Sequence, residues 1–406
     1  MLLKQTKLID IMEKKKFRIV QMLPALGWGG AQVFCLQLCN ELAKYPDYDV
    51  TLVSMYHYNP NMHLPVDMLD KKVQFVTLGK RKGTDPRIFL RIYKLLKKLK
   101  PDVVHTHLHS GYYCFLAYLL IKDNVFNKIH TLHNLAKHDA PRHGRMAFKY
   151  FFREGIIQPV SISDEVHKSA LDEYANCNII QINNGSYEVK RSPAFEEVKT
   201  AIQRLKKNDA TKVIINVARI SKQKNQQLLI DCMRIYEQEG ENVIAIILGD
   251  CVGEDKKLYN SLIAQKPNNV HFLGKVKNVS DYLLNADAFS LSSIFEGLPI
   301  SLLEALSAGV VPVCTPVGGL VNIVTEDIGF LSEGVNCESF YNALKAWLKT
   351  TPEHLKELSN NAKELYHKEF SMETCAAKYN KLYHTYSAGY KIHHLPNDNS
   401  MPLSLP

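Results

Sequence analysis

Two carboxylates stand out between Leu291 and Gly319, a segment whose other residues are mostly small or apolar. Glu296 lies in an expected loop, and Glu304 lies two turns into the helix that follows, beside positions that can face a core. An ionised carboxylate is costly to bury unless it accepts hydrogen bonds, and two adjacent ribose hydroxyls could donate to one carboxylate. Glu304 is therefore a candidate ribose ligand. The alternative is a solvated glutamate near the helix N-terminus, which the helix macrodipole favours.

Two cations flank the expected beginning of another helix. The strand from Lys212 to Ala218 is followed by Arg219 and then by Lys224, and a helix is expected from Gln226. An anion at this junction would meet two positive charges and the free N–H groups of the helix N-terminus. The arrangement is typical of a phosphate or diphosphate site.

A glycine-rich loop, residues 24–30, follows the first expected strand, Phe17 to Leu23, and leads into an apolar-striped helix. Such a junction can also bind an anion. A dinucleotide-binding G-x-G-x-x-G motif would need glycine at the position of Gln32, and no clear acidic residue ends the second strand. NAD is therefore the less favoured ligand for this loop.

Histidines gather at two neighbouring strand ends. His105 and His107 share one face of an expected strand, and His133 ends the next one. His105, His107 and His109 could supply zinc ligands, but no cysteine cluster supports a metal site. The alternative is a set of cleft-lining histidines that make structural hydrogen bonds.

Strands and helices alternate along most of the chain, which predicts an α/β fold with parallel sheets and ligands beyond the carboxyl ends of the strands. At 406 residues the chain is long enough for two domains with separate cores. Strands are expected in the first half at 17–23, 50–54, 73–76, 102–106, 128–132, 159–163 and 178–183. In the second half they are expected at 212–218, 242–248, 270–273, 288–292, 310–314 and 328–331.

The segment EGLP…EALSAGVVPV, in which Glu296 and Glu304 are spaced as E-x7-E, resembles the GT4 family of retaining glycosyltransferases, which have the GT-B fold. Further segments resemble the same family: GGAQ in the first loop, the strand ends HTHLH and TLHN, the NNG turn, and Arg219 with Lys224. The resemblance covers about Phe17 to Tyr386 and is strongest in the second half.

This resemblance implies two Rossmann-like parallel-sheet domains that face each other across a cleft. The N-terminal, acceptor-side domain is expected at 17–190 and the C-terminal, nucleotide-sugar-binding domain at 191–370, with a helix at 371–387 returning to the first domain. Residues 1–16 and 388–406 are expected to be a flexible extension and tail, and Met12 is a candidate translation start.

The resemblance also implies retaining transfer of a sugar from a nucleotide-diphosphate donor, such as a UDP- or GDP-sugar. The acceptor would be a hydroxyl of a glycan or a lipid-linked molecule in surface polysaccharide or glycolipid synthesis. By resemblance, Arg219 and Lys224 neutralise the diphosphate, Glu304 binds the ribose, and Glu296 and His133 lie beside the donor sugar. The same comparison assigns donor contacts to Gly29, Gly30, Gly297 and Leu298, and an acceptor-side position to His107. No metal or other cofactor is implied, because the D-x-D pair of Asp47 and Asp49 lies before a strand, away from the cleft loops.

Two other functions stay open. A GT-B sugar-nucleotide epimerase would need a placed acid and base and no acceptor site, and an inactive nucleotide-sugar-binding scaffold would release no nucleotide. The intact carboxylates and cations argue against an inactive scaffold. The net charge of +9 is compatible with nucleic acid, but the chain carries no recognition motif, so no nucleic-acid partner is expected.

A basic stripe suggests a membrane partner at residues 142–153. Its cations are Arg142, Arg145, Lys149 and Arg153, and its apolar neighbours are Met146, Phe148, Phe151 and Phe152, of which Phe148 and Phe152 are expected to be exposed. Such a pattern suits an interfacial helix, and the alternative is an ordinary solvated face. No run approaches the roughly 18 apolar residues of a membrane span, and nine cysteines without a C-x-x-C pair favour a reducing compartment. The expected location is the cytoplasm, with peripheral attachment at the inner face of the membrane as a hypothesis.

Overall fold

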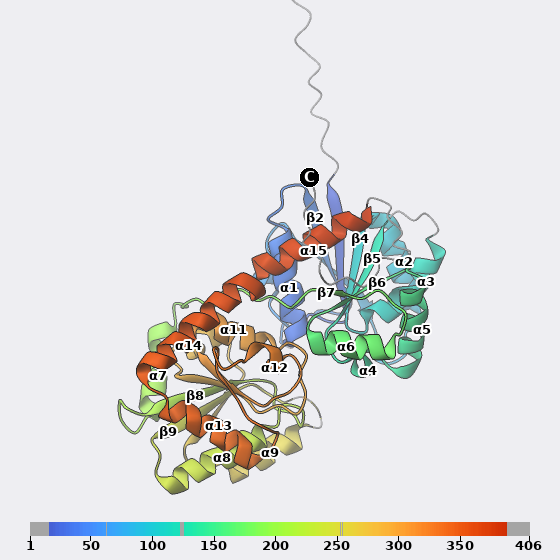
Figure 1. Cartoon of the computed structure of the whole chain (residues 1–406). Helices are drawn as coiled ribbons and strands as arrows, with labels where there is room; N and C mark the ends of the chain where they lie inside the picture. The colour runs from blue at the N-terminus through green and yellow to red at the C-terminus, as the bar shows by residue number, and fades with distance from the viewer. Residues whose placement is uncertain (1–15, 62, 122–125, 252, 254, 388–406) are drawn as a thin grey trace, which may run out of the picture.

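The computed structural model describes residues 16–61, 63–121, 126–251, 253 and 255–387, and they form two α/β domains joined by a long C-terminal helix (Figure 1). The expected termini at 1–15 and 388–406 lie outside the described residues. Each domain is built on one parallel sheet with helices on both faces. The expected architecture of two parallel-sheet domains is confirmed.

The first domain contains a seven-stranded sheet in the order β3-β2-β1-β4-β5-β6-β7, and every pairing is parallel. The strands are β1 (Phe17–Leu23), β2 (Tyr48–Tyr56), β3 (Gln74–Lys80), β4 (Val103–His107), β5 (Asn127–Leu132), β6 (Gln158–Ser161) and β7 (Ile180–Gln181). The helices are α1 (Gly30–Leu42), α2 (Arg87–Leu99), α3 (Ser110–Leu120), α4 (Ala136–Asp139), α5 (Arg142–Arg153) and α6 (Asp164–Glu173). Because helices cover both faces, consecutive strand residues such as Ile19 and Val20 are both buried.

The second domain contains a six-stranded parallel sheet in the order β10-β9-β8-β11-β12-β13. The strands are β8 (Lys212–Val217), β9 (Val243–Leu248), β10 (Val270–Gly274), β11 (Ala288–Leu291), β12 (Val311–Cys314) and β13 (Phe330–Leu331). The helices are α7 (Phe195–Leu205), α8 (Gln226–Glu239), α9 (Asp255–Gln265), α10 (Val279–Leu283), α11 (Ile300–Ala308), α12 (Leu320–Ile323), α13 (Cys337–Lys349) and α14 (Pro352–Leu365). Helix α11 ends at Gly309, whose φ of +70° is the left-handed conformation that glycine adopts without a Cβ penalty.

The C-terminal helix α15 (Met372–Ser387) begins beside the second domain and runs onto the first, where it packs along α1 (Figure 1). Its Tyr379 and Tyr383 are fully buried and make hydrogen bonds with Thr131 and Gln21 of the first domain. The crossing chain is held at its start by backbone hydrogen bonds between Ser186 and two residues around the beginning of α15, Phe370 and Met372. Polar side chains of the last helix are thus built into the core of the first domain.

The expectation that Phe148 and Phe152 of α5 are exposed was wrong. The helix is present, but Phe148, Phe151 and Phe152 are buried, and Phe148 and Phe151 pack against Phe115 of α3. Residues 148, 151 and 152 are spaced i, i+3 and i+4, which places them on one helix face, and that face covers the core. The exposed apolar side chains of α5 are instead Met146 and Tyr150.

Candidate active site

The candidate site lies where the carboxyl ends of the two sheets face each other. In each sheet the strand order reverses at one point, between β1 and β4 in the first domain and between β8 and β11 in the second. Loops that leave such neighbouring strands diverge and form a crevice for ligands. A pocket of about 150 Å³ lies there, lined by Gly30, Ala31, His133, Asn134, Ile162 and Asn184 from the first domain and by residues 223, 224 and 296–300 from the second.

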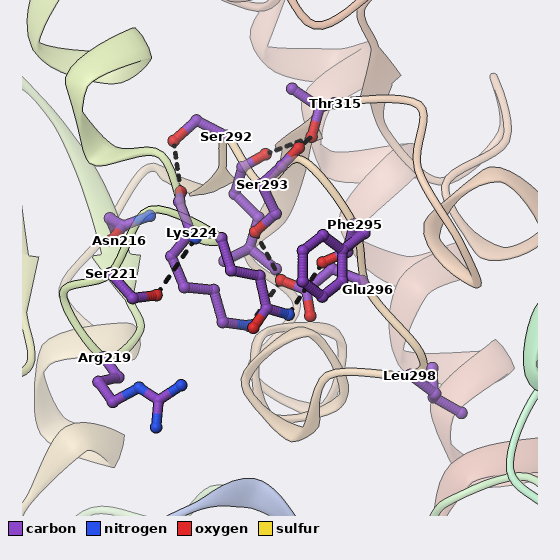
Figure 2. Close-up of polar contacts among 12 residues, drawn as sticks. Asn216, Arg219, Ser221, Lys224, Ser292, Ser293, Phe295, Glu296, Leu298 and Thr315 are labelled. Carbon is purple, nitrogen blue, oxygen red and sulfur yellow. Dashed lines mark hydrogen bonds and ion pairs between the residues drawn. The ribbon is translucent and has the colours of Figure 1, made fainter. Parts of the chain in front are cut away.

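Glu296 and Lys224 form the charged centre of this pocket. The Lys224 Nζ lies 2.5 Å from Glu296 Oε1, and the hydroxyl of Ser293 donates to the same oxygen at 2.5 Å (Figure 2). The Glu296 carboxylate is almost completely buried, and this pairing is what makes a buried charge tolerable. An ammonium group has three donors, so Lys224 keeps donors for a further anion.

The loop that carries Glu296 is fixed to the loop that carries Lys224 by several hydrogen bonds. The Gln223 side chain donates to the Phe295 carbonyl at 3.0 Å, and the Ser292 hydroxyl donates to the Asn225 carbonyl at 2.9 Å. Thr315, after β12, donates to the Ser293 carbonyl at 2.7 Å. The two functional loops therefore form one rigid unit at the edge of the second sheet.

Glycine is required where the loop after β12 approaches Glu296. Gly318 has a φ of +56°, and a Cβ added there would lie 1.9 Å from the Glu296 carbonyl oxygen. The amide of Gly319 donates to the Gly297 carbonyl at 2.9 Å. The glycine pair thus supports the backbone of the Glu296–Gly297 turn.

Arg219 is placed differently from Lys224. It is exposed, and within the described ranges its guanidinium makes no ion pair or hydrogen bond; Figure 2 shows it apart from Lys224 and Glu296. Helix α8 begins directly after this loop. The residue before it, Asn225, has a φ of +48°, and its side chain does not cap the helix. Arg219 and the N-terminus of α8 are thus available to an anion.

Glu304 lies on α11, outside the residues that line the pocket. Burial raises the pKa of Glu304 to about 7, and no nearby charge opposes that shift. Its carboxylate has no hydrogen-bond or ion-pair partner among the side chains that the structure describes. As expected, its neighbours Leu303 and Leu306 face the core. An unpartnered carboxylate in such a setting is ready to accept hydroxyl donors.

His133 and His107 are hydrogen-bonded to each other at the first domain's side of the pocket. The distance between His133 Nε2 and His107 Nδ1 is 2.9 Å, and His107 Nε2 lies 2.8 Å from Gln21 Oε1. Burial lowers the pKa of His133 to about 4, nearby Asp139 raises it and nearby His130 lowers it further. Burial also lowers the pKa of His107 well below its usual value. Both imidazoles are thus neutral near pH 7.

The first-domain glycine loop meets the second domain directly. A Cβ on Gly30 would lie 3.5 Å from the Ile300 side chain at the beginning of α11, and Gly297 lies against Ile162 and Val166 of the first domain. Gly29 lies under the folded-back side chain of Gln32. The small residues of both loops therefore permit close approach of the two domains at the pocket.

Asn184 is a pocket residue that the sequence did not reveal as functional. The NNG turn suggested only a turn, but the Asn184 side chain is 3% exposed and donates from Nδ2 to the Leu298 carbonyl of the second domain at 3.1 Å. Its Oδ1 is buried and has no hydrogen-bond partner among the residues that the structure describes. Only the fold brings residue 184 to residue 298, so no local pattern could have found this contact.

The structure brings together the expected site residues to different degrees. Gly30, His133, Lys224, Glu296, Gly297 and Leu298 all line the pocket. Gly29 and His107 lie behind that lining, and Arg219 and Glu304 lie outside it. Across the described part of the chain, no group of three or more His, Cys, Asp or Glu side chains is placed to hold a metal ion. His105 and His107 instead make hydrogen bonds to neutral side chains.

Comparisons with known proteins agree with this geometry. A model described as Glycosyltransferase Family 4 matches residues 28–166, and one described as Glycosyl transferases group 1 matches residues 197–365. The UDP-Gal:alpha-D-GlcNAc-diphosphoundecaprenol alpha-1,3-galactosyltransferase of Escherichia coli is 29% identical over 351 residues, which are 82% of this chain and 87% of that protein. An uncharacterized glycosyltransferase of Methanocaldococcus jannaschii is 29% identical over 245 residues, 54% of this chain and 58% of that protein. Among solved structures, Anabaena HepE in complex with UDP and glucose superposes with a TM-score of 0.72 at 16% identity, covering 90% of this chain and 98% of that one.

Two parallel-sheet domains with a shared pocket at their carboxyl edges define the GT-B class of folds. The two family models cover one domain each, and the relatives over both domains are glycosyltransferases. The chain belongs to the group 1 and family 4 (GT4-like) glycosyltransferases, and the family expected from the sequence is confirmed.

Proposed function

We propose that this glycosyltransferase moves a hexose from a nucleotide-diphosphate sugar, a UDP- or GDP-sugar, to a hydroxyl of a glycan or lipid-linked acceptor, with retention of the anomeric configuration. The observation that carries the proposal is the pairing of Lys224 with Glu296 in the pocket, together with the exposed Arg219, whose guanidinium makes no ion pair or hydrogen bond within the described residues. A diphosphate leaving group develops negative charge as the glycosidic bond breaks. Preorganised cations and amides that meet this charge lower the barrier.

The remaining groups fit the other parts of such a donor. Glu304 offers a carboxylate that has no partner in the described part of the chain, which suits a ribose diol. The pocket of about 150 Å³ is smaller than the roughly 300–1,000 Å³ of a complete ligand site. It suits one sugar ring, with the diphosphate toward Arg219 and the nucleoside toward Glu304. Anabaena HepE, with the same fold, holds UDP and glucose.

Retention is proposed without a covalent intermediate on Glu296. Its Oε1 already accepts a hydrogen bond from Ser293 and forms an ion pair with Lys224. Both interactions stabilise the carboxylate and so make Glu296 a weaker nucleophile. The leaving phosphate would then receive the acceptor's proton on the same face of the sugar. The anomeric configuration of the product, measured by the proton coupling at C1, tests this step, because an inverted product would exclude it.

The acceptor is proposed to be a lipid-linked glycan of surface polysaccharide or glycolipid synthesis. The Escherichia coli relative is named for an acceptor linked to diphosphoundecaprenol, and the match with it spans both domains. A lipid-linked acceptor would bring the enzyme to the cytoplasmic face of the membrane. No described helix is long and apolar enough to cross a bilayer.

A peripheral membrane contact is proposed for the outer surface of α5 and α3. On α5, Met146 is 68% and Tyr150 is 55% exposed, and the basic residues Arg142, Lys149 and Arg153 are also exposed. On the adjoining α3, Leu119 is 55% exposed. Exposed apolar side chains beside cations are typical of a surface that rests on anionic lipid. Arg145 is not part of this surface, because it is paired with Glu173 at 2.8 Å.

The decisive experiment is a thermal-shift screen with UDP-, GDP- and ADP-sugars, followed by nucleotide release with and without candidate acceptors in the presence of EDTA. A stabilising sugar nucleotide whose cleavage needs an acceptor and survives EDTA is the expected result. Nucleotide release without any acceptor dependence would favour the epimerase, and binding without release would favour the scaffold. Activity that is lost in EDTA and restored by Mn²⁺ would contradict the metal-free reaction.

A further inference from the structure

A chain of buried polar side chains runs from helix α15 to the pocket. In order, its members are Tyr379, Thr131, His105, Tyr383, Gln21, His107 and His133. All of them except His133 have no exposed surface. A row of buried polar groups is tolerated only when its members are hydrogen-bonded to one another, and such a row is correspondingly specific in geometry.

Tyr383 is the junction of this chain. Gln21 Nε2 donates to the Tyr383 hydroxyl at 2.8 Å, and His105 Nδ1 lies 2.7 Å from the same hydroxyl. On the far side, His105 Nε2 and the Tyr379 hydroxyl lie 2.7 Å and 2.9 Å from the hydroxyl of Thr131. The Tyr383 hydroxyl therefore joins a branch that leads to the pocket with a branch that ends inside the domain.

The direction of each bond determines which nitrogen of His133 carries a proton. The Gln21 amide donates through Nε2 to Tyr383, so its oxygen faces His107 and can only accept. His107 must then carry its proton on Nε2, and its Nδ1 is an acceptor for His133 Nε2. In the neutral state His133 is thus protonated on Nε2 and bare on Nδ1. That Nδ1 is buried and has no hydrogen-bond partner within the described residues.

We propose that Gln21 and Tyr383 are positioning residues, which fix the orientation and tautomer of His107 and, through it, leave His133 Nδ1 as a hydrogen-bond acceptor for a hydroxyl of the donor sugar. The proposal rests on the proposed function, because it takes the sugar to occupy the pocket that His133 lines. A fixed acceptor binds a hydroxyl well and discriminates against a sugar that lacks it. Helix α15 thereby contributes to the donor site although none of its residues lines the pocket.

Two tyrosine variants of the same helix separate this role from general packing. Tyr383→Phe removes the hydroxyl that orients Gln21, so the amide is free to turn and His107 loses its fixed tautomer. Tyr379→Phe is the matched control, since Tyr379 is also fully buried and also hydrogen-bonded, but among the described residues its hydroxyl bonds only to Thr131, at the end of the other branch. Gln21→Met breaks the same link from the first domain and serves if Tyr383→Phe does not fold.

The first measurement is the tautomer of His133 by nuclear magnetic resonance of protein labelled with ¹⁵N-histidine, without any ligand. Wild type and Tyr379→Phe are expected to carry the proton on Nε2, and Tyr383→Phe is expected to show a mixture of both tautomers. A proton on Nδ1 in wild type would overturn the proposal. The same tautomer in wild type and Tyr383→Phe would overturn it as well.

The second measurement compares affinity for UDP with affinity for UDP-galactose, UDP-glucose and UDP-N-acetylglucosamine by calorimetry. The ratio of the affinity for a UDP-sugar to the affinity for UDP is expected to fall roughly three- to tenfold in Tyr383→Phe, which corresponds to the loss of about one hydrogen bond. Affinity for UDP itself should stay unchanged, and Tyr379→Phe should resemble wild type. Equal weakening of UDP and UDP-sugars would contradict the positioning role. If wild type binds no UDP and no UDP-sugar, a UDP-sugar is excluded as the donor and the proposed function is left with a GDP-sugar, while the tautomer measurement still decides on Gln21 and Tyr383.

Discussion

Lys224 and Arg219 carry the same charge but differ in what surrounds them before any ligand binds. Lys224 neutralises the buried carboxylate of Glu296 at 2.5 Å, whereas Arg219 is exposed. Removal of Lys224 leaves Glu296 with Ser293 as its remaining side-chain partner. The two cations should therefore contribute alike to turnover and differently to folding.

The first prediction follows from this difference. Arg219→Ala and Lys224→Ala should each lower kcat/KM at least tenfold, because each removes a charge-assisted contact of about 1.5–3 kcal/mol to the leaving group. Only Lys224→Ala should also lower the free energy of unfolding, by about 1–3 kcal/mol, since it leaves a buried carboxylate without its counter-charge. Steady-state kinetics and denaturant unfolding measure both effects, with Lys222→Ala, an exposed lysine of the same loop, as the control. Unchanged turnover in either variant would remove that residue from the mechanism.

The second prediction concerns the protonation of Glu304. Burial raises its pKa to about 7 in the free protein, and ribose hydroxyls that donate to the carboxylate would favour the ionised form and lower that pKa. Binding of UDP should therefore release protons near neutral pH. Its affinity should rise from about pH 6 to about pH 8 and level off above the pKa of the free protein.

Calorimetry of UDP binding in buffers of different ionisation enthalpy measures this proton release. Glu304→Gln is the control, because it keeps the size of the side chain and the titration of the nucleotide phosphate but removes the carboxylate. The difference between wild type and Glu304→Gln should be a fraction of one proton near pH 7. Equal proton release in both proteins would show that Glu304 does not bind the nucleotide.

At the scale of elements, strands that are apolar throughout could be predicted from the sequence, whereas the bounds of very short strands could not. The run Val243–Leu248 is buried throughout, as expected for a strand covered on both faces. In contrast, only Ile180–Gln181 of the expected strand at 178–183 pairs with its neighbour. Pairing of so short a strand depends on the adjacent strand β6 rather than on its own residues, and the sequence alone does not contain that information.

For helix α5, too, the sequence alone did not show which residues are exposed at the surface. Its amphipathic spacing predicted the helix correctly, but apolar residues occur on both of its faces. Phe148 and Phe151 pack against Phe115 of α3, and Phe152 packs against Tyr174, directly after α6. Met146 and Tyr150 remain exposed. Tertiary packing decides which aromatic face is covered, and the candidate membrane surface is correspondingly smaller than the sequence suggested.

The third prediction tests this surface. The triple variant of Arg142, Lys149 and Arg153 to Gln should stay in the supernatant when wild type sediments with liposomes that contain anionic phosphatidylglycerol. Each cation near such a surface contributes about 1 kcal/mol, so three should account for roughly a hundredfold in partitioning at low salt. Salt at 1 M should release wild type, because screening then acts within about 3 Å.

The matched control for this prediction carries the same change in net charge on the other domain. Lys256, Lys257 and Lys349 are exposed lysines of the second domain, and their triple change to Gln should leave sedimentation at the wild-type level. If both triple variants lose binding equally, net charge rather than the α5 surface attracts the membrane. If wild type does not sediment, α5 is an ordinary solvated helix.

At the scale of the whole molecule, the sequence predicted two domains but not how they touch. Lys275 of the second domain lies 3.7 Å from the ring centroid of Trp28 in the first-domain glycine loop, and the rings of His138 and Phe295 are stacked 5.6 Å apart across the same cleft. Each pair joins residues more than a hundred positions apart, and neither carries a local signal. These contacts bring the glycine loop and the Glu296 loop together around the pocket.

The last prediction is that these two contacts help to hold the cleft closed. A cation–π contact and a ring pair at the surface are each worth about 0.5–1.5 kcal/mol, so the loss of both should shift the ratio of closed to open molecules by roughly five- to a hundredfold. Interfaces of this kind between domains normally permit relative motion. The double variant Lys275→Ala with His138→Ala should therefore have a larger radius of gyration than wild type in small-angle X-ray scattering, and a donor that contacts both domains should reverse the increase.

Lys277→Ala, which changes an exposed lysine two positions away, should scatter like wild type. A double variant with wild-type scattering would mean that the buried contacts of α15 and Asn184 hold the two domains together without these pairs.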